Sequence, residues 1–321
     1  MLNNEKLARR AKTIKTPVAT GAKHMKNMRK ILDELKKGRI LVSDGAWGTF
    51  LHKKGLKAGE CPEMWNLQHP DAVFEIAQSY IAAGADMIET NSFGGSRYKL
   101  ANYGLEDKVY ELNKTAAEIS RKAAGSDRFV LGSVGPTGKL LMMEEVTEAE
   151  LYDAFKEQSM ALEEGGADAI VIETMTDLEE ARIAVKAAAE NTGCEVFCTM
   201  TFDKTLTGEY RTMMGISPTE MTQVLLDSGA SVIGANCGNG IADMIGIVKE
   251  IRQVNSSIPV LIHANAGMPQ YDNGVTTFPE TPADMASRVR EIIDAGANII
   301  GGCCGTTPDH ICKIHDVVKS V

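Results

Sequence analysis

The chain has 321 residues, of which 44% are hydrophobic and 24% are charged, and its net charge is −9. This composition is typical of a globular protein with one large domain or two smaller ones, and it excludes a disordered or fibrous chain. No run of apolar residues approaches the roughly 18 that a membrane-spanning helix needs, and the acidic body beyond residue 39 argues against nucleic acid as a ligand. We therefore expect neither a membrane nor a nucleic-acid partner.

The first 39 residues are basic, with 12 lysines and arginines against three acidic residues. They lack the apolar core of a secretory signal, and their scarcity of acidic residues is compatible with a mitochondrial presequence. A frayed arm followed by an amphipathic helix over residues 25–37 is the interpretation that we favour. The first predicted unit is accordingly a basic N-terminal arm and helix over residues 1–38.

From residue 39 onward the sequence repeats one pattern, in which a helix with an apolar stripe ends at a Gly-Ala pair and a short apolar run follows. Glycine supplies the left-handed residue that ends the helix, and a short continuous apolar run is typical of a strand buried in a parallel sheet. Four runs follow such pairs, and four more lie between them. In chain order, the eight predicted strands are residues 40–44, 86–90, 129–133, 168–173, 195–202, 231–237, 259–264 and 298–304.

The helices between these strands have well-marked beginnings. Thr147 with Glu150 and Asp177 with Glu180 have the spacing of a capping box, in which each residue satisfies a backbone N–H group near the other. Three further helices place a capping hydroxyl directly before a proline, which suits the first helical position. These hydroxyl residues are Ser217, Thr281 and Thr307.

Eight strand–helix units over roughly 270 residues match the size of a (β/α)8 barrel. A doubly wound open sheet has the same alternation, but it would carry a glycine-rich phosphate loop after its first strand. Residues 44–49 (DGAWGT) do not fit that motif, and no linker follows residue 39. We therefore predict the α/β class, with a single (β/α)8 TIM barrel over residues 39–321 and an N-terminal helical extension.

Polar or glycine-rich residues stand at seven of the eight predicted strand ends. The carboxyl ends of barrel strands meet on one rim, where barrel enzymes place their active sites. Cys237 ends the sixth strand, and Cys303 and Cys304 end the eighth. Adjacent residues of a regular strand point to opposite faces, but the glycines at positions 301, 302 and 305 would let the chain leave that pleat.

A break at this point could turn all three sulfurs toward the barrel axis. Three thiolates suit zinc and leave its fourth position open, as in catalytic sites. Small buried core cysteines, or a disulfide between Cys303 and Cys304, are the alternatives. The remaining cysteines lack such surroundings, so we predict structural roles for them and a reducing, cytoplasmic location for the protein. They are Cys61, Cys194, Cys198 and Cys312.

At these residues the sequence resembles the homocysteine S-methyltransferase family of zinc-dependent thiol methyltransferases. The most specific match is residues 301–306 (GGCCGT) together with the upstream Asn236-Cys237 pair, and the resemblance runs from about residue 39 to the C-terminus. The continuation into Thr307 and Pro308 is most similar to the homocysteine-binding domain of cobalamin-dependent methionine synthases. The resemblance does not extend to the folate, cobalamin and activation domains of those synthases.

The resemblance implies an enzyme that methylates the thiol of homocysteine to give methionine. It implies a Zn²⁺ site at Cys237, Cys303 and Cys304, which would deprotonate the substrate thiol and so make the nucleophilic thiolate. The implied methyl donor is methylcobalamin on a separate corrinoid protein or domain, with S-methylmethionine or a betaine as alternatives. A non-catalytic barrel, with a structural zinc or as a docking module for a corrinoid partner, is the alternative from a different functional class.

The resemblance also implies how the rest of the substrate is bound. Glu173 and Asp44 would pair with the amino group of homocysteine. Backbone N–H groups in the turn through Gly45 and Ala46 would receive its carboxylate. Asn236 would act as a hydrogen-bonding residue at the rim.

Overall fold

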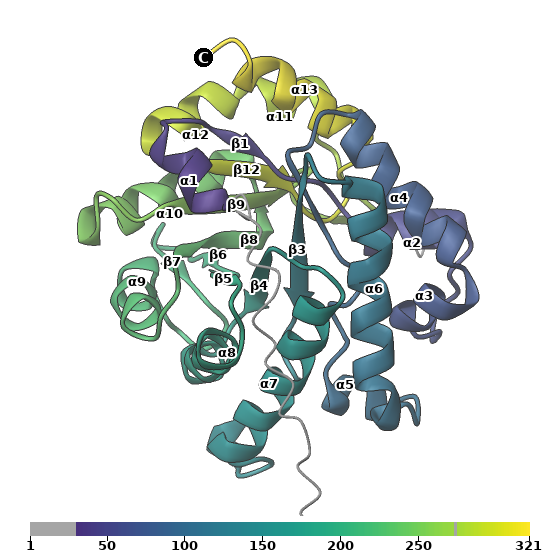
Figure 1. The fold of residues 1–321 in the computed structure, drawn as a ribbon. Coiled ribbons are helices and arrows are strands. Elements are labelled where there is room, and N and C mark those ends of the chain that lie inside the picture. The colour runs from purple at the N-terminus through teal and green to yellow at the C-terminus, as the bar shows by residue number, and fades with distance from the viewer. Residues whose placement is uncertain (1–29, 273–274) are drawn as a thin grey trace, which may run out of the picture.

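The computed structural model describes residues 30–272 and 275–321 (Figure 1). Within this part of the chain, eight parallel strands form one sheet in the order β1-β12-β9-β8-β5-β4-β3-β2. Each of them overlaps its predicted range, and the nearly closed sheet with helices around it confirms the predicted α/β barrel. The strands are β1 (Leu41–Val42), β2 (Met87–Glu89), β3 (Phe129–Val134), β4 (Ala169–Met175), β5 (Glu195–Met200), β8 (Val232–Gly240), β9 (Val260–Asn265) and β12 (Ile299–Gly302).

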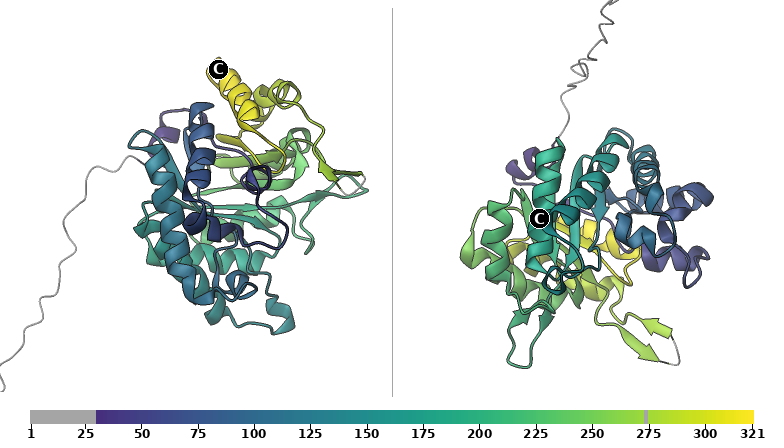
Figure 2. Two further views of the ribbon diagram at one scale, coloured as in Figure 1. Left: turned by 90° about the vertical axis from the view of Figure 1, so that its right-hand side faces the viewer. Right: turned by 90° about the horizontal axis from the view of Figure 1, so that it is seen from below.

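Helices connect the strands and cover the outside of the barrel (Figures 1 and 2). In the described residues none of them is long and apolar enough to cross a bilayer. The helices are α1 (Ile31–Lys36), α2 (Gly48–Lys54), α3 (Trp65–Gln68), α4 (Pro70–Ala82), α5 (Arg97–Ala101), α6 (Val109–Ala124), α7 (Glu148–Glu164), α8 (Leu178–Asn191), α9 (Pro218–Asp227), α10 (Ile241–Val254), α11 (Pro282–Ser287), α12 (Val289–Ala295) and α13 (Pro308–Val318).

The predicted helix caps form, with one difference. Complete capping boxes begin α7, α9 and α11, at Thr147, Ser217 and Thr281. Asp177 caps α8, but its predicted partner Glu180 does not reach back to it. The Glu180 carboxylate is buried and instead accepts hydrogen bonds from the N–H and hydroxyl groups of Thr137 in the loop after β3. A buried carboxylate needs donors, and that loop supplies two of them.

Helix α1 (Ile31–Lys36) lies across the N-terminal end of the barrel, so the residues of the predicted extension that the structure describes are helical there. Ile31 packs into an apolar cluster inside the barrel, and the N–H groups of Ile31 and Leu32 donate to the Glu195 carboxylate at 2.9 and 3.2 Å. Residues 1–29, with most of the basic arm, lie outside the described residues. The division at residue 38 stays a prediction.

Side chains close the seam between β1 and β2, the two strands at the ends of the sheet order. Asp86 accepts a hydrogen bond from the N–H of Val42 at 3.0 Å, and its own N–H donates to the Val42 carbonyl at 2.7 Å. Nearer the C-terminal end, the Asp44 carboxylate accepts a hydrogen bond from the N–H of Glu89 at 2.8 Å. Carboxylates therefore supply part of the bonding that a strand ladder supplies elsewhere in the barrel.

Two hairpins on the loops of the C-terminal side were not predicted. They are formed by β6 (Asp203–Lys204) with β7 (Tyr210–Arg211), and by β10 (Gln270–Asp272) with β11 (Val275–Thr277). Both project from the same side of the barrel (Figure 2). Strands this short and this polar have no apolar alternation for sequence analysis to detect.

Candidate metal centre and substrate pocket

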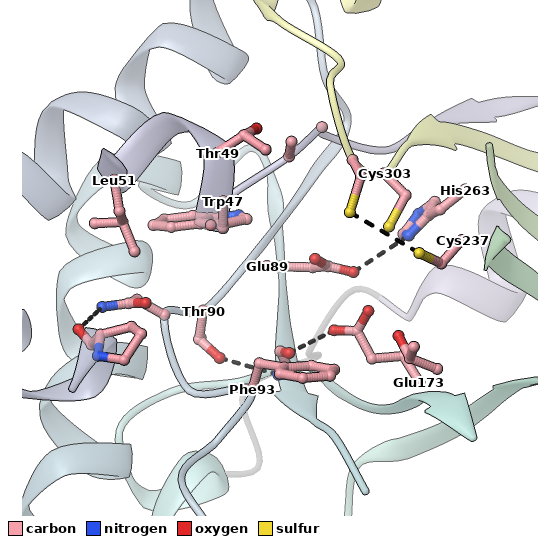
Figure 3. Close-up of a pocket in the computed structure, with 18 of the residues that line it drawn as sticks. Trp47, Thr49, Leu51, Glu89, Thr90, Phe93, Glu173, Cys237, His263 and Cys303 are labelled. Carbon is pink, nitrogen blue, oxygen red and sulfur yellow. Dashed lines mark hydrogen bonds and ion pairs between the residues drawn. The ribbon is translucent and has the colours of Figure 1, made fainter. Parts of the chain in front are cut away.

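The structure brings the three cysteines of the predicted metal site together at the C-terminal rim. Cys237 lies in β8, while Cys303 and Cys304 follow directly after β12. Their three Sγ atoms lie within 4.8 Å of one another, and those of Cys237 and Cys304 are 3.9 Å apart (Figure 3). A tetrahedral zinc with Zn–S bonds of about 2.3 Å requires sulfurs about 3.8 Å apart, so the spacing and the donor set fit zinc.

The backbone leaves regular strand geometry at both points that present thiols. β12 ends at Gly302, after which the N–H of Cys303 donates to the Ala264 carbonyl at 2.7 Å and the Cys304 carbonyl accepts from Ala266 at 3.0 Å. In β8, Cys237 adopts a left-handed φ of 59°, a conformation that costs a non-glycine residue on the order of 1–3 kcal/mol. These departures from the pleat allow both neighbouring cysteines to face Cys237.

Gly305 is required at its position for two reasons. Its φ of 81° lies in the left-handed region, and a Cβ atom there would lie 2.3 Å from Cγ of Phe278. The contact is with an aromatic ring in the chain after β11, so relief would require the loop to move. The predicted role of this glycine, to release the chain from the strand, matches its observed conformation.

The three thiols share protons unequally. Hydrogen bonds from Cys303 and Cys304 lower the pKa of Cys237 to about 3. The hydrogen bond with Cys237 in turn raises the pKa of Cys304 to about 12 and that of Cys303 above its usual value. One thiolate held by two thiols is the arrangement expected of a cluster that would release its remaining protons to solvent when a metal cation binds the sulfurs.

Beside the thiols lies a cavity of about 280 Å³, with an apolar side and an acidic side. The cysteines line it together with Glu89, Glu173 and His263, and those three come from β2, β4 and β9. Figure 3 shows both carboxylates pointing toward the middle of the site. Trp47 and Leu51 form its apolar side, across the site from Glu173 and Cys237, and Phe93 also lines it (Figure 3).

Glu173 ends a buried strand and is held from two sides. Ser133 on β3 donates its hydroxyl to one carboxylate oxygen, and Asn236 on β8 donates its amide to the other at 3.3 Å. The Asn236 carbonyl oxygen accepts from the N–H of Thr174 at 2.7 Å, where φ is 59°. Burial raises the pKa of Glu173 well above its usual value. Asn236 thus acts behind the cavity wall and does not line it.

Asp44 also lies behind the wall. Its carboxylate is 1% exposed and accepts hydrogen bonds from Trp47 Nε1 and from the N–H of Glu89, both at 2.8 Å. Burial raises its pKa to about 7. Gly45 and Ala46 line the cavity, but the N–H of Ala46 already donates to Thr306 Oγ1 at 3.1 Å. Of the five predicted substrate-binding residues, Glu173, Gly45 and Ala46 therefore reach the cavity.

Glu89 was not among the predicted site residues, although it lines the cavity. Its side chain is 10% exposed, and its Oε1 lies 3.3 Å from Nδ1 of His263. Burial raises the pKa of Glu89 to about 8 and lowers that of His263. An acidic residue at the end of an otherwise apolar strand was the signal in the sequence that could have identified it.

The other cysteines lie away from this cluster. Cys61 and Cys198 are buried, Cys194 is half-buried, and Cys312 is exposed on α13. Among residues 30–272 and 275–321, Cys237, Cys303 and Cys304 form the one group of three or more potential metal-ligating side chains.

Comparison with known proteins gives three findings. The profile of the family described as homocysteine S-methyltransferase matches residues 41–318. Methionine synthases from Mycobacterium tuberculosis and Mycobacterium leprae are 33% and 32% identical over 309 and 294 residues, or 91% and 86% of this chain. The chain spans about a quarter of the length of these curated relatives, 25% and 24% respectively. The metallated form of the homocysteine methyltransferase MmuM from Escherichia coli shares the fold with a TM-score of 0.72 at 22% identity, over 88% of this chain and 98% of that one.

Proposed function

The chain belongs to the homocysteine S-methyltransferase family, and we propose that it transfers a methyl group to the thiol of homocysteine, giving methionine. The observation that carries this proposal is the juxtaposition at one rim of three thiols within 4.8 Å and a cavity lined by buried carboxylates. Thiols suit a metal that binds sulfur, and carboxylates suit the ammonium group of an amino acid.

Cys237, Cys303 and Cys304 would hold Zn²⁺, which when bound supplies deprotonation of the substrate thiol at neutral pH. The apolar side of the cavity, with Trp47 and Leu51, would exclude water from the reacting sulfur. Three protein ligands leave room for the substrate, which distinguishes a catalytic site from a structural one. We also propose a cytoplasmic location, where these thiols would stay reduced.

Glu173 is the residue that we propose to bind the amino group of homocysteine. Its two oxygens are fixed by Ser133 and Asn236, so the carboxylate is oriented before the substrate arrives. In this proposal Gly45 and Ala46 shape the wall that meets the substrate carboxylate, and Asp44 and Asn236 position their neighbours from behind.

For the methyl donor we propose methylcobalamin carried by a separate corrinoid protein or domain. The methionine synthases similar to this chain support this choice, since the chain spans about a quarter of their length. The test is to incubate the zinc-loaded protein with homocysteine and each donor in turn, and to measure methionine. We expect product from methylcobalamin. Product from S-methylmethionine or a betaine alone would replace the proposed donor, and product from none of the three would overturn the proposed activity.

A further inference from the structure

Three carboxylates line the cavity, and they differ in how many of their oxygens accept hydrogen bonds from the protein. Both oxygens of Glu63 accept hydrogen bonds, from the N–H of Gly94 at 2.7 Å and from the thiol of Cys61 at 3.3 Å. Both oxygens of Glu173 also accept hydrogen bonds. Oε1 of Glu89 is buried and accepts none. Its titratable neighbour is His263, whose Nδ1 lies 3.3 Å away.

The surroundings of Glu89 provide no cation of their own. No lysine or arginine occurs among the described residues that line the cavity. Burial lowers the pKa of His263 and so disfavours the charged imidazole, which is the one basic side chain that the structure places beside Glu89 among the residues lining the cavity. A negative charge on Glu89 also disfavours one on Glu173, and this repulsion adds to burial in raising the pKa of Glu173. A cation that enters between them would relieve both the repulsion and the unsatisfied oxygen.

We propose that Glu89 is a second carboxylate that binds the ammonium group of the substrate, so that the pocket selects thiols that carry a neighbouring cationic amine. This inference rests on the proposed function, since it concerns the same substrate. An ammonium group has three N–H donors, enough to donate to Glu89 and Glu173 at once. Asp44 has a positioning role, because its carboxylate holds the backbone N–H of Glu89 at 2.8 Å.

The test compares two thiols that differ by the amino group. Calorimetry on the zinc-loaded protein would measure the affinity for homocysteine and for 4-mercaptobutanoate, which is homocysteine without its amine. Glu89→Gln keeps the shape of the side chain, but the amide cannot take on the negative charge that would pair with an ammonium group. Hydrogen bonds between charged groups are strong enough that homocysteine affinity should fall about 10- to 100-fold, while 4-mercaptobutanoate affinity stays within about twofold.

Glu63→Gln is the matched control, because Glu63 lines the same cavity from the short helix η1 (Pro62–Met64) and not from a barrel strand, and both of its oxygens already accept hydrogen bonds. This variant should leave the ratio of the two affinities unchanged. A Glu89→Gln variant that loses affinity for both thiols equally, or for neither, would overturn the role of Glu89. A parent protein that binds neither thiol would instead overturn the proposed function.

A second measurement does not depend on the Glu89 variant folding. If Glu89 shares the ammonium group, Glu173→Gln should still prefer homocysteine to 4-mercaptobutanoate, by about tenfold. If Glu173 binds the amine alone, this variant loses the preference entirely, and Glu89 has no part in selecting the substrate. Zinc content and circular dichroism, measured on each variant, confirm that the metal site and the fold are intact.

Discussion

At the N-terminal end of the barrel the strands contribute apolar side chains to the interior, whereas at the C-terminal end the same strands contribute carboxylates, a histidine and thiols. The N-terminal cluster contains eleven buried hydrophobic residues, including Phe129 and Phe197. At the other end Glu89, Glu173 and His263 are also buried but have pKa values shifted against their charged forms.

The difference shows where the fold obtains its stability and where it gives some up. Apolar burial at the N-terminal end stabilises the barrel at about 25 cal/mol per Å² of surface removed from water. At the C-terminal end, buried acids and left-handed φ angles at Thr174 and Cys237 cost free energy that ligands would recover. One barrel can therefore hold a strained polar site because the interior at its other end is filled by an apolar cluster.

Removing one thiol is the substitution expected to have the largest effect on the C-terminal end without disturbing the packing of the N-terminal end. Cys303→Ala should lower zinc from about one equivalent per chain to a level near zero, because two thiolates do not complete the site. Cys237→Ala and Cys304→Ala should do the same. Chelator-linked colorimetry on the purified variants measures this, and circular dichroism should show an unchanged fold.

Cys312→Ala is the control for this experiment, since Cys312 is exposed on α13 and is not a member of the thiol cluster. It should retain its zinc. A thiol variant that keeps a full equivalent of zinc would remove that cysteine from the proposed site.

The opposite change is made at the N-terminal end with Phe197→Ala. Phe197 is fully buried in the apolar cluster, and such truncations cost about 3–5 kcal/mol of unfolding free energy because they leave a cavity. Urea unfolding with chelator present measures the loss. The folded fraction should still bind zinc as the parent does, and weakened zinc binding would show that the two ends are coupled.

The sequence predicted the strands and the thiol cluster well, and both for local reasons. Apolar runs after Gly-Ala pairs indicate buried strands whatever their partners are. Cys303 and Cys304 stand among glycines, and the left-handed φ of Gly305 is the conformation that glycine adopts more readily than other residues. Local composition was enough in these cases because it determines local backbone geometry.

The roles of Asp44 and Glu89 were harder to predict because they depend on contacts between distant segments. Both acids end strands at the same rim, and the sequence cannot tell which one faces the cavity. The structure places Asp44 against Trp47 and the N–H of Glu89, where it helps to close the barrel seam. That seam arises only when the first two strands meet.

A smaller effect is expected from a substitution in the cavity that removes a carboxylate but keeps the shape of the side chain. Glu173→Gln should reduce homocysteine affinity about 10- to 150-fold, since hydrogen bonds to charged groups contribute roughly 1.5–3 kcal/mol. Zinc content should not change, because Glu173 is not a proposed ligand. Calorimetry with homocysteine and a simple alkyl thiol measures the difference. Loss of zinc, or equal weakening of both thiols, would assign Glu173 to the metal site or the fold.

The smallest effect is expected from removing a polar side chain at the N-terminal end of the barrel. Glu195, at the start of β5, accepts hydrogen bonds from the N–H groups of Ile31 and Leu32 and so caps α1. Glu195→Ala leaves these groups without their acceptor and should cost about 1 kcal/mol, as the loss of a helix cap does. Urea unfolding measures the cost, and hydrogen exchange should become faster at these two amides. Glu195→Gln keeps an acceptor and should lose less. Both variants should bind homocysteine with the affinity of the parent protein, because α1 and the thiol cluster lie at opposite ends of the barrel core. A changed affinity would mean that a disturbance at the N-terminal end of β5 reaches the substrate site at the other end.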